Sequence, residues 1–349
     1  MKMNTPLILI TLLLSLIVVG QTEITSAQAE QRPARVSVID FYGSGGLDLD
    51  KVRAALPVHE GETFPSVLAL AAMSPQIEEA VRRVVGRPAT DVAPTCCDAQ
   101  GNWWLFIGLP GSSSRSFRYN PAPTGTLRLP PQVVELYRQT MDAMQAAVEH
   151  GSEEDRSRGY ALVSDPTLRA KQLATREYAV GHVRLLRRVL AESRDDEQRI
   201  VAAHFLGYAR QSQEQIAALV RASRDPNETV RNNATRALGV LATSNPKVAA
   251  RIPAAGFIEM LNSGKWTDRN KASFLLVELS RWREPQLLAA LRAQALESLL
   301  EMARWRAPHA SDARVLLGRI AGIEEERLQK LAGDNNQVDS IIKAVQGKQ

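Results

Sequence analysis

The stretch that decides the fold is Asp225-Pro-Asn-Glu-Thr-Val-Arg-Asn-Asn-Ala-Thr-Arg-Ala-Leu-Gly239. Its beginning predicts a helix start, because Asp is a strong N-cap and proline at the first helical position gives up no needed N–H. The glutamate at the third position can reach back to the cap. Val230, Ala234 and Leu238 then lie on one apolar stripe. We therefore expect a helix that is capped by Asp225 and buries this stripe.

The same template recurs along the second half of the chain. It reads Arg, two residues, Ala, three residues and Leu in the segments 199–207, 231–239 and 269–277, and the segment 310–318 lacks only the Arg. Leu206, Leu238, Leu276 and Leu317 are therefore 32, 38 and 41 residues apart. Periods of this size are typical of helical solenoids, in which each unit is a helix pair. The positions that define the repeat are Arg199, Ala202, Leu206, Asp225, Arg231, Ala234, Leu238, Arg269, Ala272, Leu276, Ala313 and Leu317.

The pattern around Asp225, Val230, Arg231 and Ala237-Leu-Gly239 resembles HEAT repeats over residues 193–333. The resemblance implies a ladder of hydrogen bonds in which the Arg of one unit meets the Asp of another. Ser193 and Ser263 stand where the first and third copies would carry that Asp, which breaks the continuity of the ladder. The alternative reading of the arginine row is a stripe that binds anions or acids.

Residues 35–109 differ in pattern from the repeats. A β-rich run, two helices over 48–56 and 75–85, and two strands over 91–97 and 102–108 give the order β-α-α-β-β. The motif Val36-x-x-Ile39-x-Phe41-x-Gly43 resembles a POTRA domain. That resemblance implies a three-stranded mixed sheet with two helices on one face and a sheet edge that binds partners. The alternative is a generic cap that packs on the solenoid. The expected fold class is therefore mainly α, a HEAT-like α-solenoid preceded by a small α+β domain.

Two pairs of neighbouring residues in this domain are candidates for chemistry or contact. Cys96 and Cys97 are the two cysteines of the chain, and we expect two small thiols that are buried or half-buried. A vicinal disulfide or an intermolecular bridge is the alternative in an oxidising compartment. Trp103 and Trp104 follow on the last strand, where alternation sends them to opposite faces. One of them is therefore a candidate contact residue.

Less regular segments flank the repeats. Residues 110–131 hold five prolines and a serine-rich run, which predicts an irregular linker. Residues 132–192 show helical spacing and form either a helical bridge or degenerate repeats. Residues 334–349 are expected to be a C-terminal tail.

The amino terminus predicts export. Lys2 precedes an apolar run over 7–19, and small residues before position 30 favour cleavage after Ala29, so residues 1–29 are expected to be a signal peptide. The alternative is that this segment stays uncleaved as an anchor. After cleavage the mature protein is periplasmic or secreted, with no further segment of membrane-spanning length. A net charge of +5 is dispersed among charges of both signs, so we expect no nucleic-acid partner.

The sequence carries no catalytic constellation that we can identify. The five histidines, His59, His150, His182, His204 and His309, lack metal-ligand spacing. We expect no cofactor and no metal, and a non-catalytic scaffold that binds a protein or peptide on its solenoid surface. The alternative is an enzyme or small-ligand protein with a site near the Cys96–Cys97 hairpin. Neither the partner nor the oligomeric state follows from the sequence.

Overall fold

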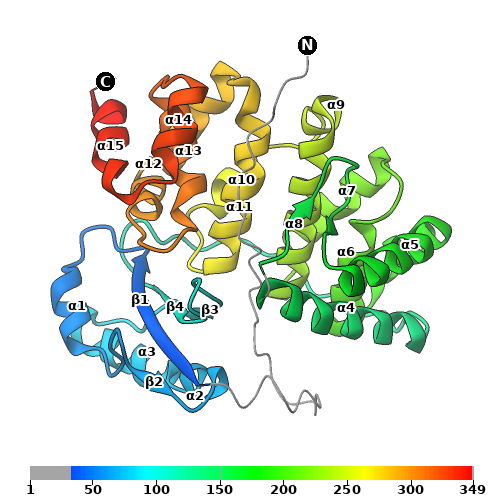
Figure 1. The fold of residues 1–349 in the computed structure, drawn as a ribbon, viewed down its shortest axis with the longest axis horizontal. Helices are drawn as coiled ribbons and strands as arrows, with labels where there is room; N and C mark the ends of the chain where they lie inside the picture. Colours follow the sequence, from blue (N-terminus) through cyan, green and yellow to red (C-terminus); the bar gives the residue numbers. More distant parts are fainter. Residues whose placement is uncertain (1–32, 150, 348–349) are drawn as a thin grey trace.

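A computed structural model describes residues 33–149 and 151–347, so the predicted signal peptide lies outside the described residues. A small α+β domain comes first and a series of packed helices follows (Figure 1). The expected fold class, mainly α with a small α+β region, is confirmed. No helix in this described part of the chain combines the length and apolarity that crossing a membrane requires.

The α+β domain contains a mixed four-stranded sheet in the order β2-β1-β4-β3. Strands β1 and β4 are parallel, and the other neighbours are antiparallel. The sequence pattern missed β2 and α2, because runs of two and five residues are too short to show a period. The elements are β1 (Ala34–Tyr42), α1 (Leu49–Ala55), β2 (Thr63–Phe64), α2 (Val67–Ala71), α3 (Ser74–Val85), β3 (Asp91–Thr95) and β4 (Trp103–Gly108).

Both faces of this sheet are covered. On one face Ile39, Leu105 and Ile107 pack with apolar residues of α1 and α3. On the other face Trp104 and Phe106 belong to the hydrophobic core of the repeats. The sheet is thus sandwiched between its own helices and the last repeats, as a domain that caps the solenoid would be.

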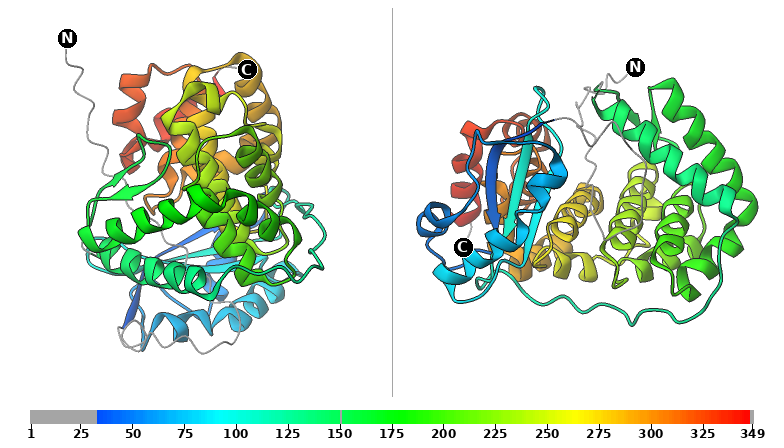
Figure 2. Two further views of the ribbon diagram at one scale, coloured as in Figure 1. Left: turned by 90° about the vertical axis from the view of Figure 1, so that its right-hand side faces the viewer. Right: turned by 90° about the horizontal axis from the view of Figure 1, so that it is seen from below.

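The remaining elements are almost all helical. They are α4 (Pro131–Glu149), β5 (Glu154–Asp155), β6 (Leu162–Val163), α5 (Pro166–Glu192), α6 (Asp196–Leu206), α7 (Gln213–Ala222), α8 (Glu228–Ser244), α9 (Pro246–Ala249), α10 (Ala255–Met260), α11 (Trp266–Leu279), α12 (Pro285–Ala303), α13 (Ala310–Ile320), α14 (Glu325–Ala332) and α15 (Val338–Gln346), with short 3₁₀ turns at 280–282 and 335–337. They follow one another in an arc, with the sheet at one end and α4 and α5 at the other (Figure 2, right).

Within 132–192, the region expected to be helical, Pro166–Glu192 form one long helix, α5, which is bent at His182. Residues 246–260 form two short helices, α9 and α10, and Pro253 between them disfavours helix at the residue before it. One detail differs from the sequence expectation. The predicted tail, 334–349, instead contains α15, whose Ile341 and Val345 are buried. Residues 338–345 show the apolar spacing of a helix, and this stripe packs against the last repeat.

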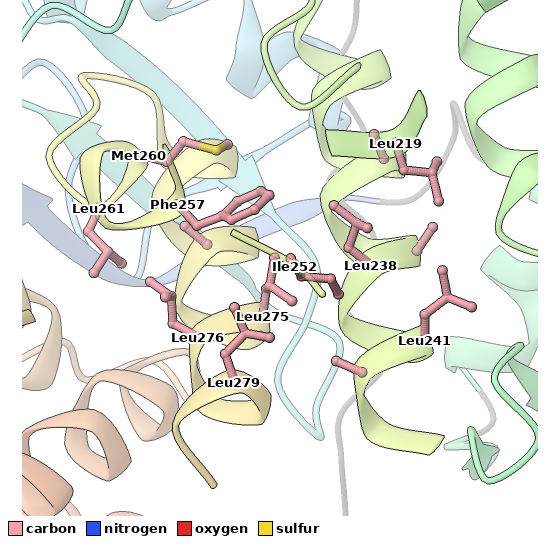
Figure 3. Close-up of a cluster of buried hydrophobic side chains, with 14 of the residues drawn as sticks. Leu219, Leu238, Leu241, Ile252, Phe257, Met260, Leu261, Leu275, Leu276 and Leu279 are labelled. Atoms are coloured by element: carbon pink, nitrogen blue, oxygen red, sulfur yellow. The ribbon is translucent and has the colours of Figure 1, made fainter. Parts of the chain in front are cut away.

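The repeated Ala and Leu positions form the centre of the core. Leu206, Leu238, Leu276 and Leu317 are fully buried, as are Ala202, Ala234, Ala272 and Ala313. Figure 3 shows Leu238 and Leu241 on α8 and Leu275, Leu276 and Leu279 on the neighbouring α11, all within one cluster of buried apolar side chains. Small alanines let neighbouring helices approach, and each leucine fills the gap that remains.

Residues 110–130, here called the strap, cross the molecule from the sheet to α4 (Figure 2, right). The strap is irregular, as predicted, but it is hydrogen-bonded to the repeats along its length. Its backbone meets the turns between units at steps of five residues: Arg115 N donates to Asn262 O, Asn120 N donates to Arg224 O, and Gly125 O accepts from Arg194 N.

Candidate functional site

The repeated arginines are buried and paired inside the solenoid. Arg199 makes two hydrogen bonds to Asp225, from Nε at 2.8 Å and Nη2 at 2.9 Å. Arg231 Nε donates to Asp268 Oδ1 at 2.8 Å. Arg269 Nε donates to Ser263 O at 2.6 Å, and its Nη1 lies 3.4 Å from Glu301 Oε2. Each arginine therefore ties its own unit to the next element along the arc.

The acids of this ladder differ from those that the sequence indicated. Asp225 does not cap α8, because its carboxylate accepts from Arg199 and Asn227 provides the cap two residues later. In the third unit the partner is Asp268, in the first turn of α11, and Ser263 Oγ donates to it at 2.8 Å. The repeat pattern called for an acid at position 263, where serine stands, and the acid is instead Asp268, five residues later.

The strap covers this ladder. Phe117 lies under the guanidinium of Arg224, and Tyr119 lies 4.2 Å from that of Arg231. Arg199, Arg231 and Arg269 are at most 2% exposed. Their geometry is that of structural pairs, and it leaves no exposed guanidinium row for an anionic polymer.

A second row of polar residues follows another face of the same helices. His204 and Arg236 stand two residues before the repeated leucines 206 and 238, and Lys271 and Asp312 stand five residues before the leucines 276 and 317. These two positions lie three residues apart, so they share one helix face. We call His204, Arg236, Lys271 and Asp312 the inner row; α6, α8, α11 and α13 each contribute one of them.

A hairpin that the sequence did not predict lies across the inner row. It consists of β5, β6 and the residues between them. Glu154 of β5 forms an ion pair with Arg236. Arg156 then reaches the next helix, with its guanidinium 5.0 Å from the ring centre of Phe274. The hairpin thus connects the surfaces of α8 and α11.

Burial shifts the titration of the inner row. Desolvation, reinforced by the charge of Arg236, lowers the pKa of His204 to about 3. Desolvation lowers the pKa of Lys271 to about 8, and Arg236 acts in the same direction while Asp312 opposes it. Desolvation raises the pKa of Asp312 to about 6. His204 is therefore neutral at pH 7, whereas the other two groups titrate closer to neutrality than usual.

Several polar atoms of this surface are buried and have no partner among the described residues. They include His204 Nε2, Asn232 Oδ1 and Arg156 Nη1. Lys271 is buried on the same surface, and it interacts electrostatically with the half-buried Asp312. A buried polar group without a partner costs about 1–3 kcal/mol. Such groups therefore mark this surface as a candidate site.

A cavity of about 100 Å³ opens in this surface. Its walls come from α4, α6 and α8 and from Ala161, which precedes β6. The lining residues are Tyr137, Met141, Met144, Ala161, His204, Gly207, Tyr208, Thr229, Asn232, Asn233, Arg236, Ala237 and Val240.

The candidates in the α+β domain lie elsewhere. Cys96 and Cys97 form a vicinal disulfide and are not the two free thiols we expected. They follow the end of β3, so the alternation of side chains along a strand does not keep them apart. Trp103 packs with the core of α1 and α3, and Trp104 packs against His309 with ring centres 5.2 Å apart. Among residues 33–149 and 151–347 no group of His, Cys, Asp or Glu side chains could hold a metal ion.

The inner row was not predicted, because the histidines were searched for metal-ligand spacing among themselves and not for their place in the repeat. His204 and Arg236 each stand two residues before a repeated leucine, and this shared position was the available signal.

Comparisons with known proteins add little. The chain matches no protein-family model and no curated protein at a significant level. Among solved structures it is similar to an engineered protein determined as a structural-genomics target, with a TM-score of 0.39 and 18% identity. The match covers 61% of this chain and 94% of that one. A likeness of this size carries no argument about fold or function.

Proposed function

We propose that the protein is an exported, non-catalytic scaffold that holds a segment of a partner protein on the inner surface of its repeats. The observation that carries the proposal is the set of buried polar atoms on this surface, His204 Nε2, Asn232 Oδ1 and Arg156 Nη1, which have no partner among the described residues. A surface that served packing alone would be more stable with apolar groups at these positions. A partner that supplies the missing hydrogen bonds would offset the free-energy cost of burying these polar groups.

The resemblances noted in the sequence belong to this proposal. The buried pairs of Arg199 with Asp225 and of Arg231 with Asp268 support repeats of the HEAT type. The parallel pairing of β1 with β4 supports a POTRA-like topology for the first domain. Strand β3 is at an edge of the sheet, and its outer side is the second contact surface that we propose. Export rests on the sequence of residues 1–29.

Site-specific photo-crosslinking tests the proposal. A photoreactive residue replaces Met141, which lines the cavity, and in a control it replaces the exposed Arg304, which directly follows α12. The proposal expects one stoichiometric adduct from native cell-envelope fractions at position 141 and none at 304. The purified partner should then bind the wild-type protein at least tenfold more tightly than a Lys271→Met, Asp312→Leu variant. Adducts at 304 alone, or equal affinities, would overturn the proposal.

A further inference from the structure

We propose that the contact between the α+β domain and the repeats is a pH-sensitive switch, because protonation of the buried ring of His309 requires the two parts to separate. The switch does not depend on the partner proposed above. Three properties of His309 lead to it: where the ring lies, how completely it is enclosed, and which charged groups surround it.

His309 lies at the boundary between the two parts of the molecule. It directly precedes α13. Its ring contacts Trp104 and Phe106 of β4, with ring centres 5.2 Å and 5.3 Å away, and Trp266 of α11, with a ring centre 5.2 Å away. The imidazole is therefore enclosed by aromatic rings from the sheet on one side and from the repeats on the other.

This enclosure suits a neutral imidazole. His309 is 3% exposed, and neither of its ring nitrogens has a hydrogen-bond partner within the part of the chain that the structure describes. An imidazolium carries a full charge and two N–H donors. Burying it without acceptors costs far more than burying the neutral ring. The neighbouring rings offer cation–π attraction, but they do not replace the acceptors that both N–H groups have in water.

The charged groups on the elements around the ring oppose a second positive charge. Strand β4 presents no titratable side chain. Burial, reinforced by the charge of Lys271 on α11, holds the pKa of His309 well below its usual 6.5. Asp312 of α13 acts on Lys271. A cation at the amino end of α13 is also disfavoured by the helix dipole.

The remaining carboxylates at this contact are engaged with other groups. Asp40 of β1 is paired with Arg306, whose backbone N–H also donates to it. Glu301 of α12 accepts from the backbone of the turn at 43–44. Neither carboxylate contributes to the pKa shift of His309. A proton can therefore be accommodated on this ring only when the contact opens to water.

The direction of the effect follows from proton linkage. The pKa of His309 is about 6.5 when the ring is in water and far lower in the closed state, so below pH 6.5 the open state binds a proton that the closed state does not. The closed state is thus favoured above pH 6.5 and loses this advantage as the pH falls. From pH 7.5 to pH 5, His309 alone should raise the ratio of open to closed molecules about 30-fold. Asp40 and Asp312, whose pKa values burial raises, act in the opposite direction where opening exposes them.

Hydrogen exchange at the Trp305 indole measures the opening. Its Nε1–H donates to Phe41 O at 2.9 Å, a bond between the repeats and the sheet whose acceptor does not titrate. Exchange in the intact mature protein is followed by NMR at pH 7.5 and pH 5 and corrected for the intrinsic rate. His309→Phe keeps a ring in place and removes the titration. The protection of the indole proton should fall about 30-fold more in the wild type than in this variant, since both carry Asp40 and Asp312.

Three controls accompany the measurement. His59→Phe changes an exposed histidine of the same α+β domain and should behave as the wild type does. His309→Leu takes the place of His309→Phe if thermal unfolding at pH 7.5 shows that the latter is not folded. The backbone amide of Leu238, inside α8, should stay at least tenfold more protected at pH 5 than the Trp305 indole, because the repeats remain folded when the contact opens.

Three results would overturn the proposal. Equal pH dependence in the wild type and in a folded His309 variant would show that this ring does not drive the opening. Equal protection of Trp305 and Leu238 at pH 5 would show that the repeats unfold together with the contact. The third result needs only the wild-type protein: ring signals of His309 that titrate near pH 6.5 while the Trp305 indole stays protected would show that the three aromatic rings hold the cation in the closed state.

Discussion

The guanidinium of Arg231 and the carboxylate of Asp268 meet across the boundary between two repeats, with 2.8 Å between Nε and Oδ1. Both side chains are almost completely buried, with exposed fractions of 2% and 1%. Backbone carbonyls of Asp225 and Pro226 accept the remaining hydrogen bonds of Arg231. The pair thus holds α8, α11 and the turn between α7 and α8 together.

Removing one member of this pair should destabilise the fold strongly. Asp268→Ala leaves the Arg231 charge buried without a partner, which typically costs about 3–5 kcal/mol. Urea unfolding followed by circular dichroism measures the change. The exposed pair of Arg138 and Glu197 is the control, since Glu197→Ala should cost about 1 kcal/mol or less. Equal losses in both variants would show that burial does not govern the strength of the ladder.

The strap should be sensitive to one glycine. A Cβ at Gly125 would lie 2.5 Å from Glu192 O, so Gly125→Ala must displace the strap from this turn. We expect a loss of about 1–3 kcal/mol and faster hydrogen exchange at the Arg194 amide, which donates to Gly125 O. Gly181→Ala is the matched control, because that helical position has open space and alanine should stabilise it slightly. Unchanged exchange at Arg194 would contradict the role given to this contact.

Glu301 should fix the α+β domain to the repeats. Its carboxylate accepts from Gly43 N, Ser44 N and two serine hydroxyls. Glu301→Gln replaces one acceptor with an NH₂ group that faces donors, so the amides of Gly43 and Ser44 should exchange faster. The global stability should fall by about 1–3 kcal/mol. Glu297→Gln, at an exposed position, should change neither quantity, and an equal effect there would refute the prediction.

His204 should make the protein less stable in acid. Because the pKa of His204 falls from its usual 6.5 to about 3 on folding, the unfolded chain binds a proton between these pH values and the folded chain does not. Stability is therefore lost as the pH falls below 6.5, by about 2 kcal/mol at pH 5. Asp312, with its pKa raised to about 6, acts in the opposite direction as the pH falls from 7 to 4.

A comparison of variants isolates the histidine. His204→Phe should show a smaller loss of melting temperature between pH 7 and pH 5 than the wild-type protein does. His182→Phe changes an exposed histidine and should follow the wild type. If the pH dependence of His204→Phe matches that of the wild type, folding does not hinder protonation of the His204 imidazole, and the prediction is wrong.

The vicinal disulfide should contribute little to global stability. Cys96 and Cys97 are adjacent, so the bond closes almost no chain and removes little entropy from the unfolded state. A Cys96→Ser, Cys97→Ser variant should unfold within about 1 kcal/mol of the wild type. Titration with a thiol reagent should detect two thiols per chain only after reduction. Thiols in the untreated mature protein would contradict the bond.

The fold was predictable wherever a period could be seen. The spacing of Ala234, Leu238 and Leu241 identified α8, and the same template located α6, α11 and α13. The β5–β6 hairpin was not predictable, because its two-residue strands show no alternation and its place depends on contacts such as Glu154 with Arg236. Asp268 was missed because its distance from Ser263 is set by where α11 begins.

The candidate site was less predictable than the fold. His204, Asn232 and Met141 line one cavity only because α6, α8 and α4 are packed together. Their spacing in the chain holds no sign of this convergence. The path of the strap could not be predicted for a related reason. The backbone of Asn120 is hydrogen-bonded to the backbone of Arg224, and such backbone contacts do not require particular side chains that a sequence would show.

The position of the sheet has a consequence for how the chain is made. Asp40 accepts from the backbone of Arg306 and Ala307, and Phe106 stacks on Trp266 with ring centres 5.0 Å apart. During synthesis the first domain emerges long before these residues do. Its aromatic face must therefore wait uncovered while the repeats are translated. A newly made chain cut short before residue 266 would present that face to any chaperone that recognises aromatic surface.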